Sequence, residues 1–139
     1  MWNFRGREGL IDEWVHGHSR ALIQDPFVFV TNTTGFDYVR MDIAEDVVDQ
    51  TLNAWNVISH VLAQVDSDLS EIVQCRYYVK EEEDCDPVLR CSKNVLNGVR
   101  PALTMVVLPA LPHPRARVAI EVTAMWGGRS VDFSSLTAS

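Results

Sequence analysis

The sequence predicts an α+β fold in which two helices cover one face of a mixed β-sheet. Three observations predict it: strand-like segments near both ends of the chain, two segments with helical periodicity, and one strand-like segment between those helices. This order of elements is typical of a sheet with its helices on one side. A length of 139 residues fits a single domain, expected over 1–139 with its core at about 17–126.

The first expected strand lies in "FVFVTNTTGFD", residues 27–37. Its β-branched and aromatic residues continue up to Gly35, where a turn is expected. Near the end of this strand, Thr31 and Asn32 offer hydroxyl, amide and backbone groups to a small ligand, although turn formation explains the same two residues. We treat both as candidate binding residues.

The first expected helix begins with Asp42 and Glu45, which have the spacing of a capping box. Apolar residues then follow at steps of three or four, as in one buried stripe. The members of this stripe are Val48, Leu52, Trp55, Ile58, Leu62 and Val65.

The second expected helix begins at Asp86, before Pro87, and ends at Gly98. Between the two helices, "SEIVQCRYYVK" at 70–80 alternates in the manner of a strand. One face of that strand carries Cys75, Tyr77 and Val79, and the other carries Gln74, Arg76, Tyr78 and Lys80.

The segments "LTMVVLP" and "RVAIEVTAMW" predict two final strands, joined by the proline-rich "ALPHPRA". On the last strand the bulky residues Val118, Ile120 and Val122 are expected to face the helices. Glu121 then lies on the opposite face, which the two helices leave open. A second subunit would have to cover that face.

Composition narrows the expected partners and compartment. Nineteen acidic against twelve basic residues give a net charge of −7, which disfavours nucleic acid and anionic membranes. The start of the chain lacks the apolar stretch of a signal peptide, so a cytoplasmic location is expected. Cys75, Cys85 and Cys91 match neither a disulfide framework nor zinc-ligand spacing, and we expect reduced thiols. No metal site is expected at His16-Gly-His18, because no third ligand has fitting spacing.

Four segments resemble the YjgF/Rid family, also called the endoribonuclease L-PSP family. They are "FVFVTNTTGFD", "SEIVQCRYYVK", "RPALTM" and "AIEVTA", in the family's order and spacing over about residues 17 to 126. The resemblance is closest to a branch with a "TTG-aromatic-D" loop and an "RPAxTM" strand. It implies a chorismate-mutase-like sandwich and a homotrimer whose sheets face inward, with a small-molecule cleft at each subunit interface.

The best-studied members of that family are imine and enamine deaminases that need no cofactor or metal. In them an arginine directly after the Pro-Ala pair holds the substrate carboxylate, and a glutamate on the last strand positions the attacking water. Glu121 matches that glutamate, but Leu103 stands at the arginine position and Met105 at that of a nearby cysteine. The resemblance therefore implies a retained acid and a missing carboxylate grip.

Further cleft positions follow from the same resemblance. Thr31 and Asn32 stand where many deaminases have Ser-Gly, and His18 is the nearest counterpart of an early tyrosine. Arg90 falls where some members place a cleft asparagine, which makes it the nearest replacement for the missing arginine. A surface or interface charge is the simpler interpretation of Arg90, as it is of Arg100 and Arg117.

These residues predict a Rid-like deaminase with Glu121 as general acid and base, acting on a small imine or enamine other than the usual 2-imino acids. Alternatively, Glu121 pairs with an arginine across the trimer. A second alternative for the protein is a non-catalytic trimer that uses the same cleft to bind a small metabolite or to stabilise a partner enzyme. Ribonuclease activity is disfavoured, because the acidic chain has no basic stripe with which to hold RNA.

Overall fold

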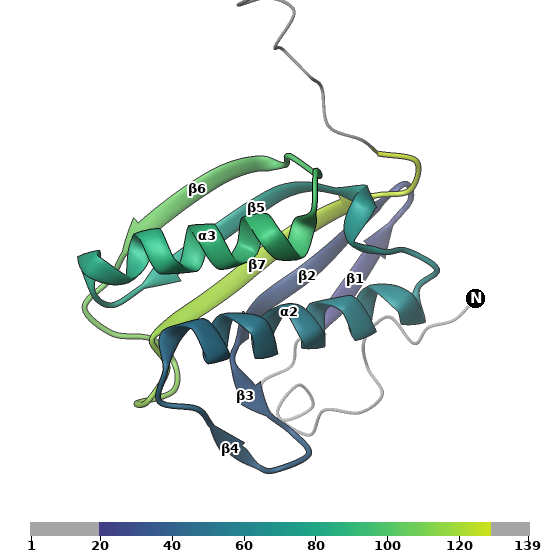
Figure 1. Cartoon of the computed structure of the whole chain (residues 1–139). Helices are drawn as coiled ribbons and strands as arrows, with labels where there is room; N and C mark the ends of the chain where they lie inside the picture. Colours follow the sequence, from purple (N-terminus) through teal and green to yellow (C-terminus); the bar gives the residue numbers. More distant parts are fainter. Residues whose placement is uncertain (1–19, 129–139) are drawn as a thin grey trace, which may run out of the picture.

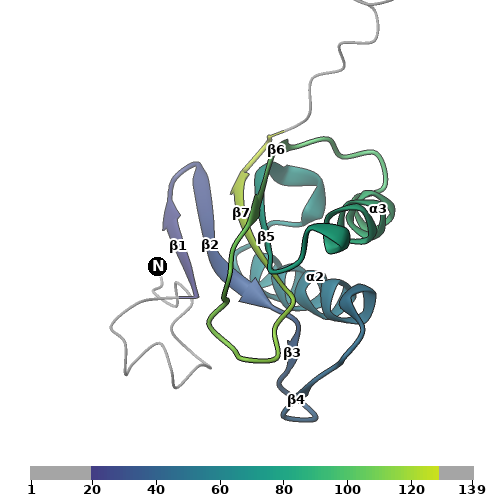
Figure 2. The ribbon, with the colours of Figure 1, turned by 90° about the vertical axis from the view of Figure 1, so that its left-hand side faces the viewer.

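A computed structural model of the chain describes residues 20–128. Its main sheet has five strands in the order β1 (Ala21–Gln24), β2 (Phe27–Thr34), β7 (Val118–Met125), β5 (Ile72–Val79) and β6 (Ala102–Val107). Strands β5 and β6 run parallel, whereas the other neighbours run antiparallel. Helices α2 (Val47–Gln64) and α3 (Cys85–Leu96) lie on one face (Figure 1, Figure 2). The predicted α+β fold class is confirmed.

Short elements connect these parts. Strands β3 (Phe36–Asp37) and β4 (Asp42–Ile43) form a separate hairpin before α2. Two 3₁₀ turns, η1 (Leu69–Glu71) and η2 (Glu82–Asp84), precede β5 and α3. Strand β1 was not predicted. It pairs with β2 through a tight turn at Asp25–Pro26, and its short length of four residues gives little periodic signal.

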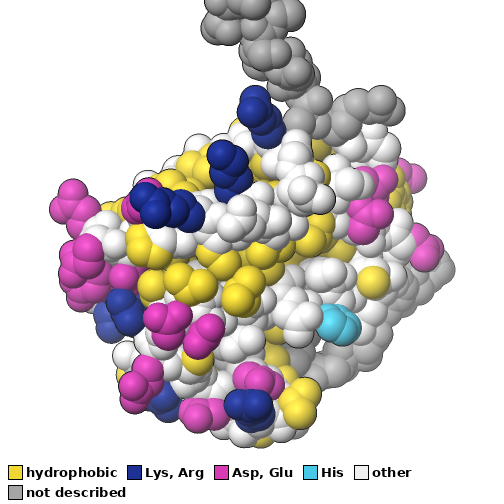
Figure 3. Space-filling view, viewed as in Figure 1, with side chains coloured by type: hydrophobic (Ala, Val, Ile, Leu, Met, Phe, Trp, Pro, Cys, Tyr) yellow, Lys and Arg dark blue, Asp and Glu magenta, His cyan; other side chains and the backbone are white. Residues whose placement is uncertain are grey.

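The core fills the space between the sheet and the two helices. It is built from the buried alternate residues of β2, β5 and β7 and from the inner faces of α2 and α3. On the solvent-facing side of the two helices, apolar side chains line the boundary between α2 and α3 (Figure 3). Trp55 lies at the centre of the core, with its ring edge-on to Tyr77 and its indole Nε1 donating to Ser92 Oγ at 2.9 Å.

The first helix begins later than predicted. Asp46 is its N-cap and accepts a hydrogen bond from the Asp49 amide at 3.1 Å. Asp42 instead lies in β4 and pairs with Arg115 at 2.8 Å, so the proposed capping box is wrong. One member of the predicted stripe is also misplaced, because Leu52 is 47% exposed. The buried side of α2 passes instead through Val47, Gln50, Thr51, Ala54, Trp55, Ile58, Val61 and Leu62.

The second helix begins at Cys85, one residue before the predicted start. Asp84 precedes it and is buried, where both of its carboxylate oxygens accept hydrogen bonds from Arg117 at 2.8 and 3.1 Å. Arg117 is therefore a structural partner of this turn rather than a free surface charge. At the other end, Asn97 has a left-handed conformation and Gly98 follows it, also at positive φ.

Among residues 20–128, no helix lies on the opposite face of the sheet (Figure 2), which we call the open face. Leu22, Phe27 and Phe29 point to this open face from β1 and β2, and they are 50%, 38% and 43% exposed. The rings of Phe27 and Phe29 stack with their centroids 6.1 Å apart. The open face is therefore apolar where β1 and β2 cross it, and Glu121 lies on the same face, as predicted.

Candidate functional site

Glu121 lies near the middle of β7, and its side chain is half-buried. Its flanking residues Ile120 and Val122 point into the core, so strand alternation turns the carboxylate to the open face. The hydroxyl of Tyr78 on β5 donates a hydrogen bond to Glu121 Oε1 at 3.1 Å. This bond orients the carboxylate and leaves its second oxygen for another ligand.

An irregularity in β2 brings Thr31 and Asn32 next to Glu121. Val30 pairs with Val122 and Thr33 pairs with Ile120, so two residues of β2 stand opposite one residue of β7. Such a bulge bends the strand locally and redirects side chains. Thr31 is half-buried and Asn32 is exposed. Three residues predicted separately from the sequence thus share one site.

The other neighbour of Glu121 is Arg76. The two residues are Cα partners between β7 and β5, and the next partner across the sheet is Thr104 on β6. Paired residues of neighbouring strands point to the same face. Thr31, Asn32, Glu121, Arg76 and Thr104 therefore form a polar row across the open face, next to the apolar part at β1 and β2.

Comparison with known proteins assigns the chain to a family. The model of the endoribonuclease L-PSP family matches residues 12–126. This chain belongs to that family. Rv2704 from Mycobacterium tuberculosis, a member of the YjgF/YER057c/UK114 family, is 30% identical. The match covers 85% of this chain and 94% of that one, with a TM-score of 0.76.

Two further relatives show the same likeness. The Rid-family protein YyfA from Yersinia pestis has a TM-score of 0.78 at 22% identity, covering 88% of this chain and 95% of that chain. The uncharacterized protein SCO2049 from Streptomyces coelicolor is 27% identical over 111 residues, which are 80% of this chain and 83% of that protein. Membership of the YjgF/Rid family is thereby established, and the fold agrees with it.

Within this family member, Leu103 and Met105 lie apart from Glu121. On the edge strand β6 they are the partners of Cys75 and Tyr77, which point to the helices. Met105 packs against the core from its edge, and Leu103 is 51% exposed. Leu103 is therefore an apolar residue on the other side of the sheet from Glu121.

The remaining predicted binding residues are not near Glu121 within one chain. Arg90 lies on α3, on the helix side of the sheet, where its Nε is 2.9 Å from Asp86 and both side chains are largely exposed. His18 lies outside the described residues 20–128, as does the rest of the His16-Gly-His18 pair. A single subunit thus brings together Glu121, Thr31 and Asn32, but not Arg90, Leu103 or Met105.

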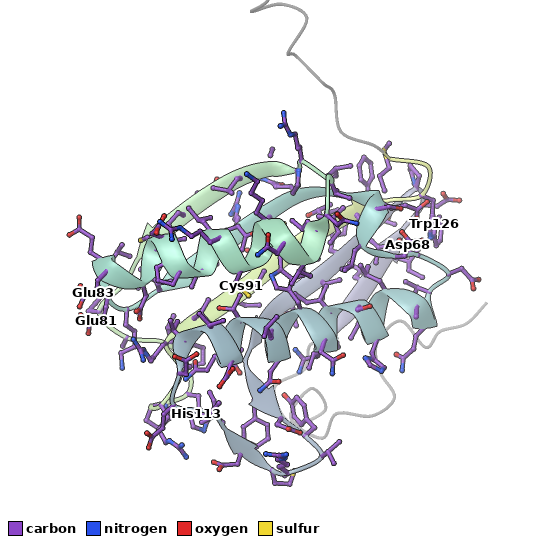
Figure 4. All side chains as sticks on the ribbon, viewed as in Figure 1. Asp68, Glu81, Glu83, Cys91, His113 and Trp126 are labelled. Atoms are coloured by element: carbon purple, nitrogen blue, oxygen red, sulfur yellow. The ribbon has the colours of Figure 1, made fainter. Side chains whose placement is uncertain are left out.

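Other reactive groups do not form a second centre in the part of the chain that the structure describes. Burial raises the pKa of the Cys75 thiol to about 12 and also raises the pKa of Cys91, so neither is an activated nucleophile. Cys91 lies on α3, and His113 lies beside the β3–β4 hairpin, 5.9 Å from the Phe36 ring (Figure 4).

No three His, Cys, Asp or Glu side chains among residues 20–128 are placed to hold a metal ion. Nor does any helix in that range have the length and hydrophobicity needed to cross a bilayer. Polar groups on the open sheet face are therefore the main candidate for chemistry in these residues.

Sequence reasoning did not select Tyr78 or Arg76 as site residues. A signal was present, because both lie on the polar side of an otherwise apolar alternating strand. What the sequence lacked was the pairing of β5 with β7, which places that polar side beside Glu121. A partner strand distant in sequence decides which residues surround the acid.

Proposed function

We propose that this YjgF/Rid family member is an imine or enamine deaminase that acts on a small amine-derived compound. Its site lies in clefts between the subunits of a homotrimer, and the compound differs from the usual 2-imino acids. The observation that supports this is the Glu121 carboxylate on the uncovered sheet face, held by Tyr78 and flanked by Thr31 and Asn32. Glu121 also matches the family's catalytic glutamate in the "IEVTA" segment.

The trimer is supported by the chemistry of the open face. Leu22, Phe27 and Phe29 expose a connected apolar surface there. Contact of such a surface with water is unfavourable, and a contiguous exposed apolar patch is typical of an interaction site. Burial of this surface by a second subunit would also enclose the polar row beside it. A water-poor cleft strengthens every hydrogen bond made to a bound ligand.

The chemistry required of Glu121 is a proton exchange. Water adds to the carbon of the protonated imine while the carboxylate accepts one of the water protons, which gives a neutral carbinolamine. The protonated carboxyl then returns that proton to nitrogen. The carbon–nitrogen bond breaks while the hydroxyl proton passes to the departing ammonia, which leaves a carbonyl compound and ammonium. The second oxygen of Glu121 is available for this exchange because Tyr78 occupies the first.

The difference in substrate follows from Leu103. An isobutyl group cannot bind a carboxylate, and an unpaired buried carboxylate costs about 1–3 kcal/mol or more. The usual substrate would therefore bind poorly at the position where the family places its arginine. Hydrolysis of RNA is not supported either, because a chain with a net charge of −7 repels the phosphate backbone.

Ammonia release from imines generated in situ by an amino-acid oxidase, and from one carboxylate-free enamine, tests this proposal. We expect turnover above the spontaneous rate for at least one substrate, and a loss of about 10²- to 10⁴-fold in Glu121→Gln. Glu83→Gln is the matched control, since Glu83 is an exposed acid in η2, just before α3, on the outside of the molecule (Figure 4).

Alternatively, the same cleft is a non-catalytic binding site for a small metabolite or stabilises a partner enzyme. Glu121 would then be a polar contact or an interface charge. In that case no substrate turns over faster than its spontaneous rate, and Glu121→Gln changes only the affinity for a ligand. Turnover that disappears in Glu121→Gln but persists in Glu83→Gln decides for the deaminase.

A further inference from the structure

Arg76 lies directly opposite Glu121 on the neighbouring strand. It lies on β5, its Cα partner on β7 is Glu121, and its side chain is exposed on the open face. Among residues 20–128 this side chain has no hydrogen-bond or ion-pair partner. A guanidinium with five donors is thus available at the polar row.

The other arginines in the described range are engaged elsewhere. Arg20 donates to hydroxyl groups of Thr33 and Tyr38, and Arg100 also makes an interaction of its own. Four more are bound to aspartates, namely Arg40 to Asp37, Arg90 to Asp86, Arg115 to Asp42 and Arg117 to Asp84. Arg76 therefore differs from them in having both proximity to Glu121 and free donors.

Strand geometry places the two charged groups around one small space. Directly opposed residues of neighbouring antiparallel strands have Cβ atoms about 4.5–5.5 Å apart. A ligand above Glu121 is consequently within reach of Arg76 on one side and of Thr31 and Asn32 on the other. The planar fork of a guanidinium matches the two oxygens of a carboxylate.

We propose that Arg76 binds the carboxylate of the compound on which Glu121 acts, so that the site takes a small imine or enamine bearing a carboxylate. This inference rests on the proposed function above. Arg76 supplies from β5 the fork that Leu103 on β6 cannot supply. The carboxylate is then held on the Glu121 side of the sheet, whereas Leu103 faces the helix side. A changed carboxylate position explains how the family's chemistry persists with a different substrate.

Calorimetric binding of product-type carbonyl compounds to the full-length protein tests this inference without requiring turnover. The anionic probes are 4-oxopentanoate and 5-oxohexanoate, whose carboxylates lie farther from the carbonyl than in a 2-oxo acid, and 2-butanone is the neutral probe. We expect at least one anionic probe to bind the wild type and to bind Arg76→Gln about ten- to a hundredfold more weakly. Affinity for 2-butanone is expected to be the same in both proteins.

Two variants serve as controls. Arg40→Gln removes the same charge from the exposed loop between β3 and β4 and is expected to leave binding unchanged. Arg76→Lys keeps the charge without the fork, so we expect an intermediate affinity. If Arg76→Gln alters the oligomeric state, the affinity of Arg76→Lys for the anionic probes is compared with that of the wild type instead. Wild-type affinity in Arg76→Lys would then overturn the bidentate contact.

The outcomes separate this inference from the deaminase proposal. Failure of both anionic probes to bind, or equal binding by wild type and Arg76→Gln, overturns the role of Arg76. Binding that depends on Arg76 but without ammonia release from any imine supports Arg76 and rejects the deaminase. Turnover of an anionic imine with an unchanged KM in Arg76→Gln retains the deaminase and rejects the carboxylate contact.

Discussion

Glu121 receives polar neighbours from both adjacent strands. The bulge of β2 supplies Thr31 and Asn32, and β5 supplies Arg76 and the hydroxyl of Tyr78. An isolated acid on a sheet face would only be a solvated charge. The hydrogen bond from Tyr78 fixes the orientation of the Glu121 carboxylate, which proton transfer requires.

The buried titratable groups on the other side of β5 lead to a prediction for stability. Burial raises the pKa of Cys75 to about 12, compared with an ordinary value of 9.0. The native state keeps the proton that the unfolded chain loses, so the free energy of unfolding is fully retained below pH 9 and decreases between about pH 9 and 12. Burial also raises the pKa of Tyr77, which adds to the decrease above pH 10.

Urea unfolding at several pH values between 7 and 11 measures this decrease. Cys75→Ala has a lower stability at neutral pH because of the cavity it creates. Its loss of stability above pH 9 is expected to be smaller than that of the wild type, because one buried proton-binding group is gone. Equal slopes in the two proteins would show that Cys75 does not contribute.

At the scale of elements, Gln50 joins α2 to the segments around it. Its side-chain amide donates to the carbonyls of Ala44 at 2.7 Å and Arg115 at 3.1 Å, and its Oε1 accepts from the Arg117 amide at 2.8 Å. The start of β7 is thereby tied to the start of α2. Gly35 follows β2 and lies against the backbone of Gln50.

Gly35→Ala is expected to destabilise the protein by about 2–3 kcal/mol through overpacking. A Cβ at this position would come within 2.4 Å of the Gln50 carbonyl oxygen and 2.5 Å of its Cα, which are backbone atoms of a helix and cannot move away cheaply. Gly98→Ala is the comparison. That glycine has φ of +96° and no atom within 4 Å of an added Cβ, so only a backbone cost of about 1 kcal/mol is expected. Chemical denaturation measures both, and equal losses would contradict the close-approach explanation.

At the scale of the whole molecule, residues 20–128 leave the open sheet face without a covering helix. Its apolar part at β1 and β2 and its polar row at β7 and β5 adjoin each other. A subunit interface that covers the apolar part would also enclose the polar row. Assembly and site formation are therefore coupled in the proposed trimer.

Sedimentation equilibrium of the wild type is expected to give a mass of about three times 15.7 kDa. Phe29→Glu places a charge in the centre of the apolar part of the open face and is expected to give folded monomers, because a buried unpaired charge is costly. Leu52→Glu is the matched control, since Leu52 is also exposed, at 47%, but lies on α2 on the helix side. A trimer that persists in Phe29→Glu, or a monomeric wild type, would contradict this arrangement.

The sequence alone determined the fold class, the order of the main elements and the position of Glu121 on the uncovered face. Each of these follows from local periodicity, because alternation and helical spacing are properties of neighbouring residues. The same alternation correctly placed Cys75 and Tyr77 in the core. Helix starts were less well predicted, since Asp42 has the spacing of a cap but is used in an ion pair with Arg115.

Only the tertiary structure decided which residues surround Glu121. The β2 bulge and the pairing of β7 with β5 join segments that are far apart in the chain, and a one-residue shift in either register would exchange their faces. The parallel pairing of β6 with β5 turned Leu103 and Met105 to the helix side, and the antiparallel pairing of β5 with β7 left Arg76 opposite Glu121. Periodicity tells which face of its own strand a residue occupies. Which strands lie beside that residue depends on long-range pairing, and the spacing of residues within one strand does not predict this pairing.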